Sequence, residues 1–311
     1  MNDDTPLPPE APHALNPPDG AVLYYWLGVK PTADITLDIV DSAGRVVRHL
    51  SSARVSPVPE AAHTPFPEYW LEQPSGLPTG AGTNRTNWDL RYDAPRVFSH
   101  TFEINANPGL TPASPLGPLA LPGEYTARLT VDGKQYLQTL QVENDPRSPA
   151  SAPELRAQHA LLLNLLDAID ASWDGDQAVA ALRSAVARTA PTGAAAEVVS
   201  AAAALQPALD AVAGPQREGG AQASPTFRSV NGRMVDQLKM QDNADLAPTT
   251  AMLAAYGAAC EDLAKVEANW GRVIGGELSA FNTVLVRHGL AAVAAAARPL
   301  AACRPLPQRR P

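Results

Sequence analysis

Hydrophobic and polar residues alternate along several short stretches in the first half of the chain. Residues 35–50 alternate on either side of a short turn at 42–44, and residues 123–142 do so on either side of the Asp-Gly pair at 132–133. A period of two residues is typical of half-buried strands, and Asp-Gly is a strong signal for a tight hairpin turn. Both stretches are therefore predicted to be antiparallel hairpins.

Further alternation at 22–27 and 86–92 raises the number of predicted strands to at least six. No helical period lies between them, which favours a β-sandwich of the immunoglobulin or fibronectin type III kind. Residues 52–83 and 93–121 are rich in proline and aperiodic, and they are longer than most loops in compact domains. We expect these two segments to be functional or to face a partner.

The pattern changes to a helical period in the second half. Between Thr249 and Trp270, hydrophobic residues recur every three or four positions and form one stripe: Met252, Tyr256, Ala259, Leu263, Val266 and Trp270. Such a stripe is the packing face of an amphipathic helix. Similar patterns predict helices at 153–171, 176–189, 194–213 and 276–288, and one that begins at Ser224-Pro225 and carries Phe227, Val230, Met234 and Leu238. Amphipathic helices with short connections indicate an antiparallel helical bundle.

Composition divides the chain near residue 150. Of the 31 prolines, 21 lie before that point, whereas alanine dominates after it. Ser151 and Glu154 have the spacing of a capping box at the start of a helix. The predicted fold class is therefore all-β plus all-α in two domains. The expected parts are a Pro-rich linker at 1–18, the β-sandwich at 19–146, the helical bundle at 151–290 and an Ala/Pro/Arg-rich tail at 291–311.

The net charge of −8 comes mainly from the first half, where residues 1–150 carry 17 acidic residues against 10 Lys and Arg. Nucleic acid requires clustered positive charge, which only the tail offers, so no nucleic-acid partner is expected. No uninterrupted apolar run approaches the roughly 20 residues that cross a bilayer, so membrane insertion is not expected either. The first residues, MNDDTPLPPEAP, lack the pattern of a secretory signal.

Two cysteines, Cys260 and Cys303, lie 43 residues apart and outside any CxxC motif or Cys/His cluster. This arrangement indicates neither a zinc site nor a disulfide scaffold. No metal site and no cofactor are expected.

Three consecutive aromatic residues, Tyr24, Tyr25 and Trp26, could form a platform on which sugars stack. Strand alternation points Tyr25 away from its two neighbours, and aromatic residues favour half-buried strands. We therefore expect core packing for these residues, with ligand binding as the alternative. Trp88 is also expected in the core, with Asp89 and Arg91 on the exposed face of its strand.

Acidic residues suggest catalysis only weakly. Asp19, Glu68 and Glu124 could serve as the paired carboxylates of glycoside hydrolysis, but nothing in the sequence predicts the cleft that raises the pKa of a general acid. Residues 170–176, DASWDGD, imitate the start of an EF-hand loop, yet the twelfth position is Ala181, where a Glu is required. A loop between two helices explains the same residues. No catalytic residue is assigned.

The histidines show no clustering with other metal-ligating residues. His159 lies on the apolar face of its predicted helix, so a packed side chain is expected there rather than a metal ligand. His63, His100 and His288 are isolated in the sequence.

Several segments are similar, in this order, to one bacterial family: "DDTPLPPEAPHALNPPDGAVLYYWL", "GTNRTNWDLRY", "LPGEYTARLTVDGK" and "VENDPR". They resemble the region that follows the β-propeller in large bacterial proteins with sortilin-like or BNR (Asp-box) repeats, often labelled glycosyl hydrolases. The helical segments "SVNGRMVDQLKMQDNADLAPTTAMLAAY" and "GELSAFNTVLVRHGL" extend the resemblance to roughly residues 3–290. The repeated Asp-box hairpins of a propeller do not occur in this sequence.

This resemblance implies a non-catalytic accessory module that packs against or spaces a β-propeller, present as a domain or as a separate subunit. No enzyme activity is expected of this chain alone. One alternative is a fragment of a glycosyl hydrolase whose active site lies in the propeller. The other is a carbohydrate-binding module that uses Phe66, Tyr69 and Trp70 in the loop "TPFPEYWLE".

The same resemblance bears on location. Full-length relatives are expected in the periplasm or outside the cell. The chain as written starts within what resembles the linker after the propeller, which suggests a truncated or split reading frame and a cytoplasmic location.

Overall fold

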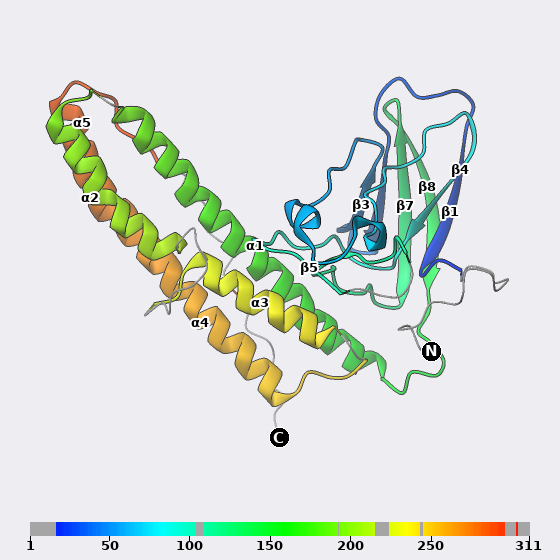
Figure 1. The fold of residues 1–311 in the computed structure, drawn as a ribbon. Coiled ribbons are helices and arrows are strands. Elements are labelled where there is room, and N and C mark those ends of the chain that lie inside the picture. Colours follow the sequence, from blue (N-terminus) through cyan, green and yellow to red (C-terminus); the bar gives the residue numbers. More distant parts are fainter. Residues whose placement is uncertain are drawn as a thin grey trace. The chain divides into compact units, whose positions relative to one another are not determined.

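The computed structural model describes residues 17–103, 108–191, 193–214, 224–242, 245–295 and 303. It combines antiparallel β-sheets with α-helices (Figure 1). The strands are β1 (Ala21–Leu27), β2 (Thr36–Asp41), β3 (Val46–Ser51), β4 (Gly82–Trp88), β5 (Thr101–Phe102), β6 (Ala113–Ser114), β7 (Gly123–Val131) and β8 (Lys134–Val142). The helices are α1 (Ala152–Thr189), α2 (Ala196–Ala213), α3 (Phe227–Gln241), α4 (Thr250–Val273) and α5 (Ser279–Arg287). Nearly all of the predicted linker at 1–18 and most of the tail at 291–311 lie outside the described residues.

The chain forms two compact units, and neither is a single continuous stretch. The first, here called the β unit, comprises Met1–Ala94, Ser99–His159 and Ala244–Ala247. The second, the helical unit, comprises Pro95–Phe98, Ala160–Asn243 and Pro248–Pro311. Four residues of the proline-rich segment 93–121 thus belong to the helical unit, and the first turns of α1 belong to the β unit.

The β unit contains a four-stranded antiparallel sheet in the order β3-β2-β7-β8, a two-stranded sheet of β1 and β4, and the short pair β5-β6. Both predicted hairpins are present, as β2-β3 and β7-β8. At the tip of the second, Asp132 and Gly133 have φ angles of 45° and 79°. Positive φ at both positions is the geometry of a type I′ turn, whose twist matches that of the flanking strands.

The strand predicted at 86–92 is displaced, because β4 runs over Gly82–Trp88. Leu90 has a φ of 60°, and the Asp89 carboxylate accepts a hydrogen bond from the Arg91 N–H at 3.0 Å. This Asx-type turn ends the strand after Trp88, so Asp89 and Arg91 do not lie on the face of a strand as predicted. Trp88 is fully buried, as expected, and its ring meets that of Tyr125 edge-on at 5.3 Å.

One 38-residue helix, α1, replaces the two helices predicted on either side of a loop at 170–176. Arginines from distant segments hold the acidic residues of this stretch within the helix. Arg96 binds Asp170 at 3.2 Å and Asp174 at 2.6 Å, and Arg228 binds Asp176 at 3.0 Å. These ion pairs also explain the carboxylates that imitated a calcium loop.

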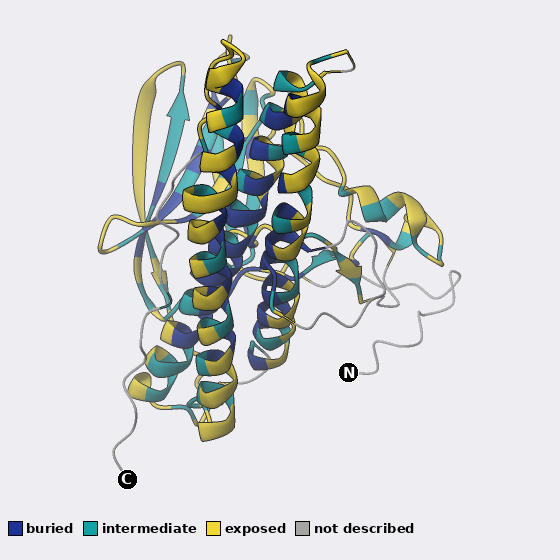
Figure 2. Ribbon diagram, turned by 90° about the vertical axis from the view of Figure 1, so that its left-hand side faces the viewer, coloured by how far each residue is buried: buried dark blue, intermediate teal, exposed yellow. Residues whose placement is uncertain are grey.

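The predicted hydrophobic stripes form the core of the helical unit. Figure 2 shows buried residues along one side of each long helix and exposed residues on the opposite side. Five predicted stripe residues of α4 are buried as predicted, whereas Met252 is only partly buried; the five are Tyr256, Ala259, Leu263, Val266 and Trp270. The α3 stripe is also buried, but its N-cap is Thr226, in a capping box with Ser229, and not Ser224.

The last predicted helix, at 276–288, is not separate. A single π-helical turn, Ile274–Leu278, joins α4 to α5 without a break. Among the described residues, α2 is the one helix long and apolar enough to span a membrane. Its Leu205, Leu209 and Val212 are buried in the core of the helical unit.

The segment Pro95–Phe98 packs within the helical unit. Val97 is 6% exposed and belongs to the core of that unit. The Phe98 ring stacks on Trp173 at 4.7 Å and carries the Arg228 guanidinium at 4.7 Å. Asn231 donates to the Arg96 carbonyl at 3.3 Å. These four residues therefore connect α1 and α3.

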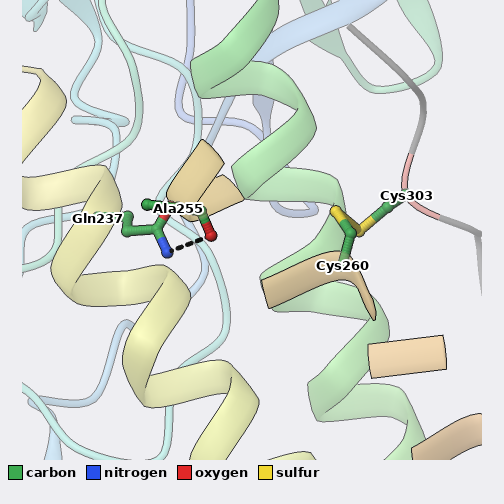
Figure 3. The surroundings of a disulfide bond; sticks show 4 residues. All are labelled: Gln237, Ala255, Cys260 and Cys303. Carbon is green, nitrogen blue, oxygen red and sulfur yellow. Dashed lines mark hydrogen bonds between the residues drawn. A yellow bond between two sulfur atoms is a disulfide. The ribbon is translucent and has the colours of Figure 1, made fainter. Parts of the chain in front are cut away.

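A disulfide joins Cys260 on α4 to Cys303, with the two Cα atoms 5.6 Å apart (Figure 3). The sequence did not indicate this bond. Spacing along the chain does not report distance in space, and this bond requires only that Cys303 lie beside the α4 turn that carries Cys260. Nearby, Gln237 on α3 donates to the Ala255 carbonyl at 3.2 Å.

Candidate binding surfaces of the β unit

The three aromatic residues of β1 do not share one environment. Tyr24 and Trp26 are 67% and 71% exposed, which corrects the expectation that they pack in the core. Tyr25, on the opposite face, donates its hydroxyl to the Pro78 carbonyl at 2.6 Å, and burial raises its pKa to about 12. The β1-β4 sheet buries Leu27, Asn84 and Trp88 on its inner face, and nothing in the described chain covers its outer face to the same degree.

A row of polar residues on β4 lies beside the two exposed rings. The register pairs Tyr24 with Arg85 and Trp26 with Thr83. Directly paired residues of an antiparallel sheet point to the same face, with Cβ atoms about 5 Å apart. Arg85 and Thr83 are exposed, so the outer face of this sheet, here called the β1-β4 face, combines two aromatic rings with a guanidinium and a hydroxyl.

The Trp26 side chain lies close to the backbone of Gly28, just after the end of β1. A Cβ atom added at Gly28 would come within 3.2 Å of the six-membered part of the indole. This distance is shorter than most Cβ contacts in proteins, so a glycine, which has no Cβ atom, suits the position beside the ring. The ring is thus supported by the backbone while it stays largely exposed.

The predicted ligand-binding residues Phe66, Tyr69 and Trp70 lie in the loop between β3 and β4. Tyr69 is 66% exposed, whereas Phe66 and Trp70 are half-buried. The Tyr69 and Trp70 rings meet edge-on at 5.3 Å. The Phe66 carbonyl accepts from the Thr64 hydroxyl at 2.7 Å.

The structure brings the two long proline-rich loops together. The Tyr69 and Trp70 carbonyls accept from the backbone N–H groups of Gly109 and Thr111, and the Glu72 N–H donates to the Thr111 carbonyl. The Glu60 carboxylate lies 3.2 Å from His100 Nδ1 and also accepts from the His100 N–H. We call the described residues of 60–72 and 100–111 the joined-loop surface.

The carboxylates considered for glycoside hydrolysis, Asp19, Glu68 and Glu124, are all exposed. Asp89 forms an ion pair with Arg48 at 3.5 Å. Burial raises the pKa of Glu72, the neighbouring Asp89 carboxylate raises it further, and the Arg48 guanidinium opposes both effects. Asp19, Glu68 and Glu124 are thus surface side chains and are not enclosed in the structure.

Two histidines that appeared isolated in sequence have carboxylate partners. His100 binds Glu60, and His288 binds Glu197 at 2.8 Å. His159 is packed as expected: it is 8% exposed, its Nε2 lies 3.3 Å from the Tyr92 hydroxyl, and burial lowers its pKa to about 4. Within the described ranges, no group of three His, Cys, Asp or Glu residues could hold a metal ion.

Sequence reasoning named the joined-loop aromatics but overlooked Arg85. The signal that could have found it is the alternation itself, which places Tyr24 and Trp26 on one face and predicts a neighbouring strand beside them. Chemically, both surfaces offer aromatic rings for stacking and polar groups for hydrogen bonding. A scan against family models, a search of curated proteins and a search of solved structures each find no match for this chain.

Proposed function

We propose that the β unit is an immunoglobulin- or fibronectin III-like sandwich and that the helical unit is an antiparallel bundle. The strand orders β3-β2-β7-β8 and β1-β4 support this, because they correspond to C′-C-F-G and B-E of such a sandwich. Tyr125 adds support. It lies at the start of β7 and donates its hydroxyl to the Leu121 carbonyl at 2.8 Å, which is the bond of a tyrosine corner.

We also propose that the chain is a non-catalytic accessory module that docks a β-propeller domain or subunit. The observation that carries this proposal is the joined-loop surface, in which backbone hydrogen bonds fix two loops that are far apart in sequence. Loops this long are seldom needed only to connect strands. Residues 52–83 contain six prolines and residues 93–121 contain five, so less conformational entropy is lost when a partner binds.

Tyr69 is the proposed anchor of this interface. Tyrosine and tryptophan are enriched at the energetic centres of protein interfaces, where they bury a large area at low entropic cost. Tyr69 is exposed, and its ring is steadied by the edge-on contact with half-buried Trp70.

The test uses the β-propeller encoded immediately upstream of Met1 in the genome, produced as a separate protein. We expect the two proteins to co-elute in size-exclusion chromatography, and Tyr69→Ala to weaken the complex at least about tenfold. Tyr136→Ala is the matched control, since Tyr136 on β8 is 56% exposed and outside the loops. No upstream propeller in any frame, or equal binding by Tyr69→Ala and wild type, would refute the proposal.

A second candidate function is carbohydrate binding by Phe66, Tyr69 and Trp70, which the exposure of Tyr69 favours. Electrophoresis through gels containing neutral polysaccharides tests it. Retardation of the wild type that is lost in Trp70→Ala supports this function, and equal mobility of the two proteins in every gel rules it out.

A further inference from the structure

The β1-β4 face carries two large aromatic side chains that the proposed docking surface does not use. Tyr24 and Trp26 are among the most exposed large hydrophobic residues of the described chain. Residues two apart on a strand are about 7 Å from each other and point the same way. They therefore form one continuous aromatic strip on the outer face of the sheet.

The composition of this face suits a sugar better than a protein. A stable protein interface buries roughly 800 Å² on each partner around an apolar centre. Here the aromatic strip is one strand wide, and the residues beside it are Thr83, Arg85 and Asn87. Stacking rings flanked by a few hydrogen-bonding groups are the usual components of a small-ligand site.

Charge identifies the class of sugar. β1 contains no charged residue, and Arg85 is the only one on β4. No described carboxylate pairs with Arg85, although the first half of the chain has 17 acidic residues against 10 basic ones. An unpaired guanidinium beside Tyr24 can bind a carboxylate through two parallel hydrogen bonds.

We propose that the β1-β4 face binds an acidic polysaccharide, with pyranose rings stacked on Tyr24 and Trp26 and a uronate carboxylate bound by Arg85. The Thr83 hydroxyl, opposite Trp26, lies where it can hydrogen-bond a sugar hydroxyl. This site is separate from the joined-loop surface. Its ligand class, the uronate polysaccharides, follows from pairing an aromatic strip with a single cation.

The experiment is affinity electrophoresis of the full chain in gels that contain alginate, polygalacturonate or hyaluronan, with xylan and glucomannan as neutral counterparts. We expect at least one acidic polysaccharide to retard the wild type and the neutral ones not to. Trp26→Ala should weaken binding about tenfold or more, as loss of a stacking anchor does. Arg85→Gln should weaken it to a similar extent and remove most of its salt dependence.

Tyr136→Ala, which removes an exposed aromatic ring from another strand, should bind as the wild type does. Because Tyr24, Trp26 and Arg85 are exposed, circular dichroism should show their variants folded. Absence of retardation by all three acidic polysaccharides, or retardation unchanged by Trp26→Ala, overturns the proposal. The proposal is also overturned if the protein binds a neutral polysaccharide and Arg85→Gln does not change that binding. It is overturned as well if Trp26→Ala changes the oligomeric state and leaves polysaccharide binding unchanged. Tyr69→Ala should leave this binding intact, so failure here is distinct from failure of the docking proposal.

Discussion

Gly175 lies in the middle of α1, where the packing of α1 against α3 leaves no room for a side chain. A Cβ atom at this position would lie 2.4 Å from the ring of Phe227, which is fully buried. Gly257 provides a matched control, because it lies inside α4 and a Cβ atom there would meet nothing within 4 Å. Replacing each glycine with alanine should therefore change stability in opposite directions.

The magnitudes follow from two effects. Alanine favours a helix over glycine by about 1 kcal/mol at both positions. At Gly175, a methyl group must displace a buried ring by roughly 1 Å, and overpacking of this severity costs about 3 kcal/mol. The expected net result is a loss of about 2 kcal/mol for Gly175→Ala and a gain of about 1 kcal/mol for Gly257→Ala.

Thermal melts followed by far-UV circular dichroism measure this difference. For a unit of this size, each kcal/mol shifts the midpoint by about 2 to 4 °C, so the two variants should differ by roughly 6 to 12 °C. If Gly175→Ala were as stable as Gly257→Ala, Phe227 could not lie against α1 as described. The close packing of α1 against α3 at Gly175 would then be refuted.

Two further predictions concern His159 and the disulfide. Burial holds the pKa of His159 at about 4 in the folded protein, so only the unfolded chain takes up this proton between about pH 6.5 and 4, and the unfolding free energy should fall by about 3 kcal/mol over that range. Urea titrations at both ends of the range should show a shallower dependence for His159→Gln, and identical slopes would contradict the burial. Replacing Cys260 and Cys303 with serine should cost about 2 to 4 kcal/mol of helical-unit stability, measured by urea unfolding. Two alkylatable thiols in the denatured, unreduced wild type would show that the bond is not formed.

Local chemistry explains which elements the sequence predicts well. The β7-β8 hairpin depends on Asp132-Gly133, whose backbone preferences act within two residues, and the α4 stripe depends on a period that repeats within one helix. The single α1 helix was missed for the opposite reason. Aspartate, serine and glycine at 170–176 favour a loop locally, and the groups that stabilise them there, Arg96 and Arg228, come from segments far away in sequence.

The candidate site shows the same limit. Alternation correctly divides Tyr24 and Trp26 from Tyr25, but it does not tell whether one face of a strand or both are covered. Whether one face or both faces of a strand are covered depends on what packs against the sheet, which is a property of the whole unit. Trp88 was predicted correctly because it points to the buried face of its strand, where its ring meets that of Tyr125. The joining of the two proline-rich loops likewise depends on backbone bonds that no local pattern encodes.

Val97 and Phe98 contribute to the helical unit, although they are encoded well before α1. One half of the gene can therefore not be exchanged for an unrelated half without a loss of packing in the helical unit. Recombination at the proline-rich joint near residue 150 would supply a new first half without the hydrophobic residue that fills this position between the helices. A transplanted helical half would inherit a vacancy about the size of a valine side chain, for which loss of buried contacts costs roughly 1 to 3 kcal/mol. Val97 and the helical residues around it are therefore expected to change together in evolution, although they are encoded in different halves of the gene.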